Sequence, residues 1–141
     1  MEIFRAAAAG GKKKDARQLP ALVLAYIGDT VFDLYVRTAL IGGVDAPVHA
    51  LHLSSAKIVC AAGQTAAYHR IESMLTEEEQ DAFRRGRNAH SGTVPKNQKV
   101  TDYRTATGLE TLLGTLYWEG KSERITELMN IALEGVLPNG I

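Results

Sequence analysis

The sequence predicts an all-α fold, a single bundle of five to seven helices. Apolar residues recur at intervals of three or four over most of the chain, which is the spacing of one helix face. Helix-starting and helix-breaking residues separate these stretches, and neither an alternating strand pattern nor an internal repeat is evident. The chain has 141 residues, of which 45% are hydrophobic and 23% charged, so one domain with a real core is expected.

The first 18 residues are expected to form a flexible basic tail, and residues 19–141 the folded domain. Two glycines followed by three lysines interrupt any regular pattern in the tail. Residues 19–41 are predicted as one long helix, because its apolar residues recur at helical spacing and Pro20 suits a first turn. The glycines at residues 42–43 are expected to end this helix.

Four further helical segments are predicted along the rest of the chain. They are expected over residues 49–72, 76–87, 103–118 and 122–134. Thr76 and Glu79 have the spacing of a capping box, in which each side chain accepts a backbone hydrogen bond from the other residue. Ser122 is expected to cap the last helix, and residues 88–102 have the composition of a loop.

The composition limits the cellular compartments and the binding partners that can be expected for this protein. Cys60 is the only cysteine, so no disulfide within the chain is possible, and its apolar neighbours predict a core position. A reducing, cytoplasmic setting fits, and no apolar run reaches the roughly 18 residues that a membrane span needs. The net charge is zero, yet residues 84–104 carry six Lys and Arg against one carboxylate. This basic segment predicts local binding of phosphates, with a solvated basic loop as the alternative.

Two carboxylates stand in apolar surroundings, where a charge is costly to bury without a partner. Asp29 directly follows Gly28 in the first long helix, and Glu110 lies among leucines, four residues before Gly114. A glycine inside a helix costs about 1 kcal/mol, which makes sense if something approaches the backbone closely there. Two such carboxylates can converge and bind a hard divalent cation, which activates water for phosphoryl chemistry. The alternatives are a surface ion pair of Asp29 with Arg37 or with a lysine, and a partly exposed helix carboxylate at Glu110.

Other catalytic chemistries find little support in the sequence. It holds no Cys/His cluster with zinc spacing, no phosphate-binding glycine loop of the Walker type and no G-x-S-x-G motif. The four histidines are scattered, and His49 and His52 are expected to be a surface pair. Asp33 shares a helix face with Asp29 and Arg37, so a supporting role at the metal and a salt bridge both remain open.

Three motifs in this order resemble the catalytic domain of ribonuclease III in its Mini-ribonuclease III form. Residues 24–32 (LAYIGDTVF) are similar to the family's signature helix. Residues 85–97 contain RGRNA and then SGTVPKN, which resemble the segment peculiar to Mini-ribonuclease III. Residues 103–114, with YR and then TGLETLLG, resemble the second acidic helix. The similarity covers about residues 19–134.

This resemblance implies a ribonuclease III-type endonuclease domain that forms a homodimer with two active sites, each cutting one strand of double-stranded RNA. It further implies that Asp29 and Glu110 are catalytic and hold the Mg²⁺ cofactor. The implied products carry 5′-phosphate and 3′-hydroxyl ends, and the implied substrate is the precursor of large-subunit ribosomal RNA. Larger ribonuclease III enzymes have further carboxylates at the positions of Leu22, Ala25 and Thr107, and their absence here is typical of the Mini form.

No appended double-stranded-RNA-binding domain is expected, so the catalytic domain is expected to bind RNA phosphates and 2′-hydroxyls by itself. The expected cationic contacts come from Lys57, Arg84, Arg85, Arg87, Lys96, Lys99 and Arg104. The expected hydrogen-bonding side chains are Asn88, Ser91 and Asn97. A ribosomal protein that presents the substrate is a further partner consistent with the resemblance, and no membrane partner is expected.

Two other classes of protein remain open at this point. One is a non-catalytic RNA-binding relative that acts in ribosome assembly, which the presence of both Asp29 and Glu110 disfavours. The other is a purely structural helical dimer whose carboxylates form salt bridges, which the dense basic segment disfavours. Absent or salt-insensitive affinity for duplex RNA would favour the structural dimer, because phosphate binding weakens with salt.

Overall fold

The computed structural model describes residue 8, residues 14–89 and residues 99–137 of the chain. These residues form six α-helices and two short 3₁₀ helices, and none of them lies in a β-strand, so the all-α prediction is confirmed. The α-helices are α2 (Ala21–Gly43), α3 (Val48–Val59), α4 (Ala61–Ile71), α5 (Glu77–Arg87), α6 (Val100–Trp118) and α7 (Ser122–Ala132). The 3₁₀ helices are η1 (Ala16–Gln18) and η2 (Glu72–Met74).

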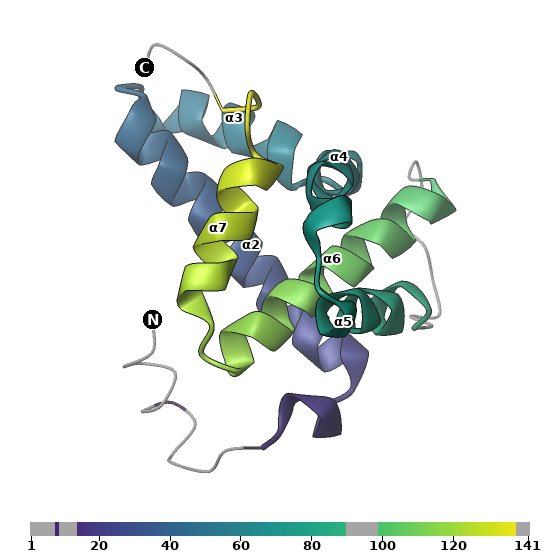
Figure 1. Cartoon of the computed structure of the whole chain (residues 1–141). Helices are drawn as coiled ribbons and strands as arrows, with labels where there is room; N and C mark the ends of the chain where they lie inside the picture. The colour runs from purple at the N-terminus through teal and green to yellow at the C-terminus, as the bar shows by residue number, and fades with distance from the viewer. Residues whose placement is uncertain (1–7, 9–13, 90–98, 138–141) are drawn as a thin grey trace.

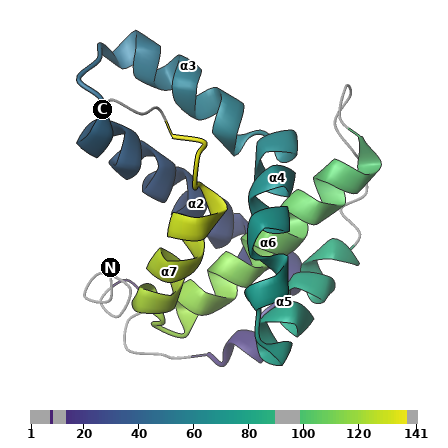
Figure 2. The same cartoon turned by 45° about the horizontal axis from the view of Figure 1, so that its top comes forward.

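Helix α6 runs through the centre of the bundle (Figure 1), where it contacts α2, α4, α5 and α7. Leu109, Leu112 and Leu113 on α6 have no exposed surface, and they pack with Phe32 of α2 and Met129 of α7. Helix α3 packs on α2 and α4 at one end of the molecule (Figure 2). A residue near the middle of α6 is therefore within reach of several helices.

The predicted helix over residues 49–72 is two helices that meet at Cys60. Cys60 adopts an extended conformation, with φ −68° and ψ 165°, which ends α3 and begins α4. Its side chain is exposed and donates to the Lys57 carbonyl at 3.4 Å, so the prediction of a core cysteine is wrong. The bend turns Cys60 outward while Ile58 and Ala61, on either side of it, stay buried.

The helix starts follow the predicted capping chemistry in one case and not in another. The Glu79 amide donates to Thr76 Oγ1 at 3.1 Å, and the Thr76 amide donates to the Glu79 carboxylate at 2.9 Å, so the predicted capping box is confirmed. Ser122, expected as the cap of the last helix, is instead its first residue. Lys121 holds the cap position, and its side chain makes no capping hydrogen bond, so this prediction is wrong.

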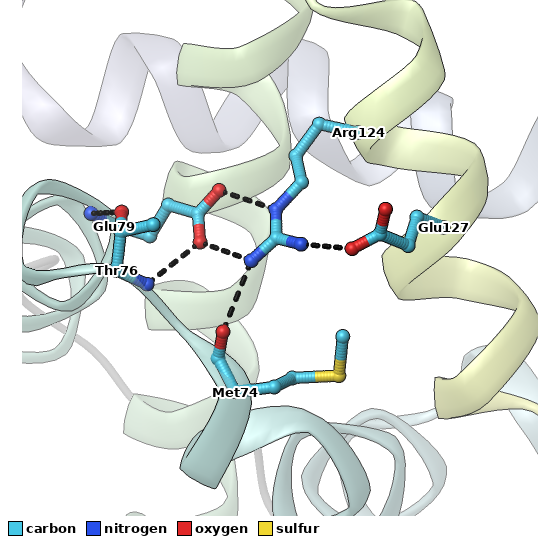
Figure 3. Close-up of polar contacts among 5 residues, drawn as sticks. All are labelled: Met74, Thr76, Glu79, Arg124 and Glu127. Atoms are coloured by element: carbon cyan, nitrogen blue, oxygen red, sulfur yellow. Dashed lines mark hydrogen bonds and ion pairs between the residues drawn. The ribbon is translucent and has the colours of Figure 1, made fainter.

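A polar cluster ties α5 to α7 at the edge of the bundle (Figure 3). The Arg124 guanidinium donates to both Glu79 carboxylate oxygens at 2.8 Å and to the Met74 carbonyl at 3.0 Å, and it pairs with Glu127. The hydrogen bonds from Arg124 hold the pKa of Glu79 below its usual range, against the opposing effect of burial. Because Glu79 also belongs to the Thr76 capping box, one ion pair fixes the start of α5 against α7.

The described residues ahead of α2 lie against α5 and α6. Trp118 Nε1 donates to the Lys14 carbonyl at 2.7 Å, and the Arg85 guanidinium donates to the Leu19 carbonyl at 2.9 Å. Most of the predicted tail, residues 1–13 apart from residue 8, lies outside the described residues. Within the described part of the chain, no helix combines the length and the apolar character of a membrane span.

Candidate active site at the crossing of α2 and α6

Helices α2 and α6 cross so closely that their backbones meet at two glycines. A Cβ atom at Gly28 would lie 1.7 Å from the Glu110 carbonyl oxygen, and one at Gly114 would lie 1.9 Å from the Leu24 carbonyl oxygen. Any side chain at either position would push the two helices apart. The interpretation of Gly28 as a point of close backbone approach is confirmed, and the approaching element is α6.

This crossing brings together the two carboxylates singled out in the sequence. Asp29 follows Gly28 on α2, and Glu110 is the residue of α6 whose backbone meets Gly28. Burial raises the pKa of Glu110 to about 8, helped by hydrogen bonding to Asp29 and by the Asp29 charge. A carboxyl group with that pKa keeps its proton through neutral pH, which spares Glu110 a negative charge next to Asp29.

The two carboxylates differ in exposure. Glu110 is partly buried, whereas Asp29 is exposed, so the expectation of apolar surroundings for Asp29 is wrong. The apolar residues that follow Asp29 turn toward the core instead, and Phe32 has no exposed surface. Arg37 Nε donates to both carboxylate oxygens of Asp33, at 3.2 and 3.1 Å, which is the salt-bridge alternative considered for Asp33 and not a pairing with Asp29.

A third polar side chain, which the sequence reasoning missed, reaches the carboxylates from α4. Gln64 is only 2% exposed, and its Nε2 donates to Glu110 Oε2 at 3.3 Å. The signal for it is present in the sequence, because Ala61, Gln64, Ala67 and Ile71 follow the buried face of α4. A polar residue at such a core position needs a hydrogen-bond partner, and Glu110 provides it.

A cavity of about 300 Å³ opens beside Asp29, between α2 and α3. It is lined from α2 by Asp29, Thr30, Asp33 and Arg37, and from α3 by His52, Ser55, Ala56 and Val59. The lining is mostly polar and carries both signs of charge. A polar, charged substrate therefore has room to reach Asp29.

The residues predicted to bind RNA lie on three elements. The last turn of α5 carries Arg84, Arg85 and Arg87, followed by the C-cap residue Asn88. Exposed cations also occur at the start of α6, Lys99 and Arg104, and near the end of α3, Lys57. The remaining candidates, Ser91, Lys96 and Asn97, lie outside the described residues.

Two of the α5 cations have contacts that bear on their roles. Arg85 donates to the Leu19 carbonyl, which gives it a part in holding the segment before α2. Arg87 Nε donates to Asn88 Oδ1 at 3.3 Å, and its guanidinium carbon lies 5.9 Å from the centroid of the Phe83 ring. Both side chains remain exposed, so a contact with RNA is sterically open to each.

Comparison with known proteins identifies the family of this chain. Residues 22–121 match the family model described as the Ribonuclease III domain. The chain belongs to the ribonuclease III family. Mini-ribonuclease 3 of Thermoanaerobacter sp. (strain X514) is 43% identical over 122 residues, which cover 86% of each chain. Mini-ribonuclease 3 of Clostridium tetani is 42% identical over 122 residues, covering 86% of this chain and 81% of the relative.

A solved structure shares the fold of this ribonuclease III family member. The crystal structure of protein FN1578 from Fusobacterium nucleatum matches with a TM-score of 0.79 at 30% identity, covering 87% of this chain and 94% of that chain. The resemblance noted from the three sequence motifs is thereby confirmed at the level of family and fold.

The residues of this candidate site fit a divalent cation, the cofactor class of the ribonuclease III family. Asp29 and Glu110 offer carboxylate oxygens, which hard cations prefer, and a cation there would relieve the repulsion that now keeps a proton on the pair. Among the described residues, no group of three or more His, Cys, Asp or Glu side chains is placed to hold a metal ion. Two carboxylates suit magnesium, because this ion keeps several waters and also binds substrate phosphate.

Proposed function

We propose that this ribonuclease III family member is a Mg²⁺-dependent endoribonuclease that hydrolyses double-stranded RNA at Asp29 and Glu110. Double-strand-specific endonucleolytic cleavage is the activity of the family. The observation that carries the assignment of the site is the carboxylate pair itself, held at a glycine-lined helix crossing although this raises the pKa of Glu110 to about 8. Strongly perturbed carboxyl groups of this kind are typical of functional sites. Residues 19–141 are proposed as the catalytic domain.

In this proposal Asp29 and Glu110 would hold Mg²⁺ through their carboxylate oxygens, and Glu110 would give up its proton to solvent to do so. When bound, the ion would polarise a water and offset negative charge on the phosphate. The protein holds the two carboxylates near each other before substrate arrives, because Gly28 lets α6 approach α2 closely. The cavity between α2 and α3 gives a phosphodiester access to Asp29. Hydrolysis would leave 5′-phosphate and 3′-hydroxyl ends.

RNA binding is proposed for the cations at the end of α5 and the start of α6. Arg87, Lys99 and Arg104 are exposed there, and Arg84 makes an exposed pair with Asp81, which RNA phosphate can replace at little cost. The proposed set also includes Lys57, Arg85, Asn88, Ser91, Lys96 and Asn97. Because A-form RNA is recognised mainly through phosphates and 2′-hydroxyls, the affinity should fall with rising salt.

A homodimer is part of the proposal, supported by large apolar side chains that are exposed on α2 and α3. Tyr26 is 81% exposed, Ile41 70%, Val48 67% and Leu53 57%. Single exposed apolar residues are common on monomers, whereas several on two packed helices favour a surface that a partner covers. Each of the two sites in such a dimer would cut one strand of the duplex.

The proposed substrate in the cell is the precursor of large-subunit ribosomal RNA, met in the cytoplasm and presented by a ribosomal protein. The support for a ribonuclease of this kind is the similarity to proteins named Mini-ribonuclease 3. The competing function, a non-catalytic RNA-binding protein in ribosome assembly, predicts that precursor RNA is bound and released uncut.

The test compares cleavage and binding by four proteins on the same duplex and precursor RNAs in Mg²⁺. Wild type should cut, Asp29→Asn and Glu110→Gln should bind but not cut, and Glu134→Gln should behave as wild type because Glu134 is an exposed carboxylate outside the site. Cleavage by either site variant at the wild-type rate would remove that residue from the site. Binding without cleavage by wild type would establish the non-catalytic alternative.

A further inference from the structure

The hydrogen bond from Gln64 to Glu110 is the least expected polar contact in the core. Gln64 is 2% exposed on a helix face otherwise made of Ala61, Ala67 and Ile71. Burying a carboxamide in such surroundings costs free energy. One hydrogen bond compensates this cost without a large net gain in stability. A leucine or methionine would fill the position without that cost, so a glutamine here needs an explanation other than packing.

The need to hold α4 against α6 does not provide that explanation. The next residue, Thr65, already joins the same two helices, since its Oγ1 donates to the Asp102 carbonyl at 3.2 Å. Apolar contacts of Ala67 and Ile71, which have no exposed surface, bury the rest of the face. What distinguishes Gln64 from Thr65 is its partner, a side-chain oxygen of the carboxylate pair and not a backbone carbonyl.

We propose that Gln64 is a positioning residue of the metal site, whose carboxamide fixes the orientation of the Glu110 carboxylate for binding a divalent cation. The proposal rests on the proposed function of Asp29 and Glu110. Glu110 is on α6 and Asp29 on α2, so Gln64 of α4 brings a third helix to the pair. Ligands held by such outer contacts bind metal more tightly, because less side-chain freedom is lost on binding.

The chemistry of a carboxamide suits this role. Its NH₂ group donates at every pH near neutrality, and the donor stays the same whether Glu110 holds a proton or a cation. A lysine or arginine donor would add a positive charge that competes with the cation, and a third carboxylate would add to the existing repulsion. Gln64 therefore orients a metal ligand without changing the charge of the site.

The test is a matched pair of substitutions on adjacent residues of α4. Gln64→Met keeps the length and volume of the side chain and removes its hydrogen bond, whereas Thr65→Val removes the Thr65 hydrogen bond to Asp102 and keeps the shape. The readouts are Mn²⁺ affinity without RNA, followed by electron paramagnetic resonance, and the midpoint of thermal unfolding without metal. Gln64→Met should bind Mn²⁺ about 10-fold more weakly or worse, with an unchanged or higher midpoint. Thr65→Val should lower the midpoint and keep the Mn²⁺ affinity.

The outcomes separate this inference from the proposed function. If wild type shows neither saturable Mn²⁺ binding nor RNA cleavage, the proposed function fails, and the inference fails with it. If wild type binds and cuts while Gln64→Met keeps the wild-type Mn²⁺ affinity, only the role of Gln64 is overturned. Gln64→Asn, whose carboxamide is one methylene short of Glu110, should repeat the loss of affinity. If neither Gln64 variant folds, Gln64 is a structural residue and the inference is likewise overturned.

Discussion

The close crossing of α2 and α6 makes Gly28→Ala the most informative single substitution. The added methyl group would lie 1.7 Å from the Glu110 carbonyl oxygen, 2.6 Å from its carbon and 2.8 Å from the Gly114 nitrogen. All three are backbone atoms of α6, so no side-chain rotation can relieve the overlap. The helices must move apart by well over an ångström, because ordinary contacts of a Cβ atom begin at 3.4 Å.

The expected loss of stability follows from two opposing terms. Overpacking a core contact lowers the free energy of unfolding by about 1–3 kcal/mol. Replacing glycine by alanine inside a helix raises it by up to about 1 kcal/mol. A net loss of about 1–2 kcal/mol is expected, which lowers the midpoint of thermal unfolding by roughly 4 °C for each kcal/mol in a domain of this size. Activity should suffer more, since a displacement of about 1 Å at a catalytic group costs about 100-fold in rate.

The control lies on the same helix. A Cβ atom at Gly42 would meet nothing within 4 Å, so Gly42→Ala should raise the midpoint slightly and leave cleavage unchanged. Thermal unfolding and single-turnover cleavage of a duplex RNA, measured on both variants, give the comparison. If Gly28→Ala matched Gly42→Ala in both assays, the close crossing would not be what places Glu110 beside Asp29.

Three further predictions concern pH, the α5–α7 ion pair and RNA binding. The pKa of Glu110 is raised in the folded chain, so wild type loses stability as the pH rises from the ordinary Glu range toward 8. Without metal, Glu110→Gln should therefore melt above wild type at about pH 8 and level with it at about pH 4; a lower midpoint at about pH 8 would contradict the raised pKa of Glu110. Arg124→Met leaves the 8%-exposed Glu79 without its main partner and should cost about 2–3 kcal/mol in urea unfolding near neutral pH. Because the pKa of Glu79 is lowered by folding, that loss should shrink as the pH falls through this lowered pKa, and a pH-independent loss would assign it to packing. Arg87→Gln should lower the salt dependence of duplex binding by about one unit in log–log slope, and an unchanged slope would remove it from the interface.

The sequence predicts the fold well where the residues of a single helix are enough to show which of its sides is buried and where it begins. The leucines of α6 and the Thr76 capping box are local patterns, and both have their predicted roles. The bend at Cys60 has no such local signal, because apolar neighbours on both sides fit a continuous helix equally well. Only the packing of α3 on α2 and of α4 on α6 decides that the chain must turn there.

The candidate site also depends on contacts between helices, which the sequence of one helix does not reveal. Asp29 and Glu110 are each ambiguous when taken alone, and only the two glycines hint that their helices meet. The face of α4 predicts that Gln64 is buried, but it does not predict the partner of Gln64, because Glu110 lies on another helix. The exposure of Asp29 also depends on which face of α2 the other helices cover, which no single-helix pattern determines.

Two positions near the carboxylate pair, Ala25 and Thr107, bear on the proposed role of Gln64. Ala25 is 6% exposed and Thr107 8% exposed, and the Thr107 hydroxyl donates to the Tyr103 carbonyl at 2.9 Å, within α6 itself. A carboxylate at either position would add a third negative charge beside a pair that already retains a proton at neutral pH. A neutral donor at Gln64 orders Glu110 without that repulsion. In the proposed metal site, the Gln64 carboxamide would thus hold the orientation of Glu110 before any cation is bound.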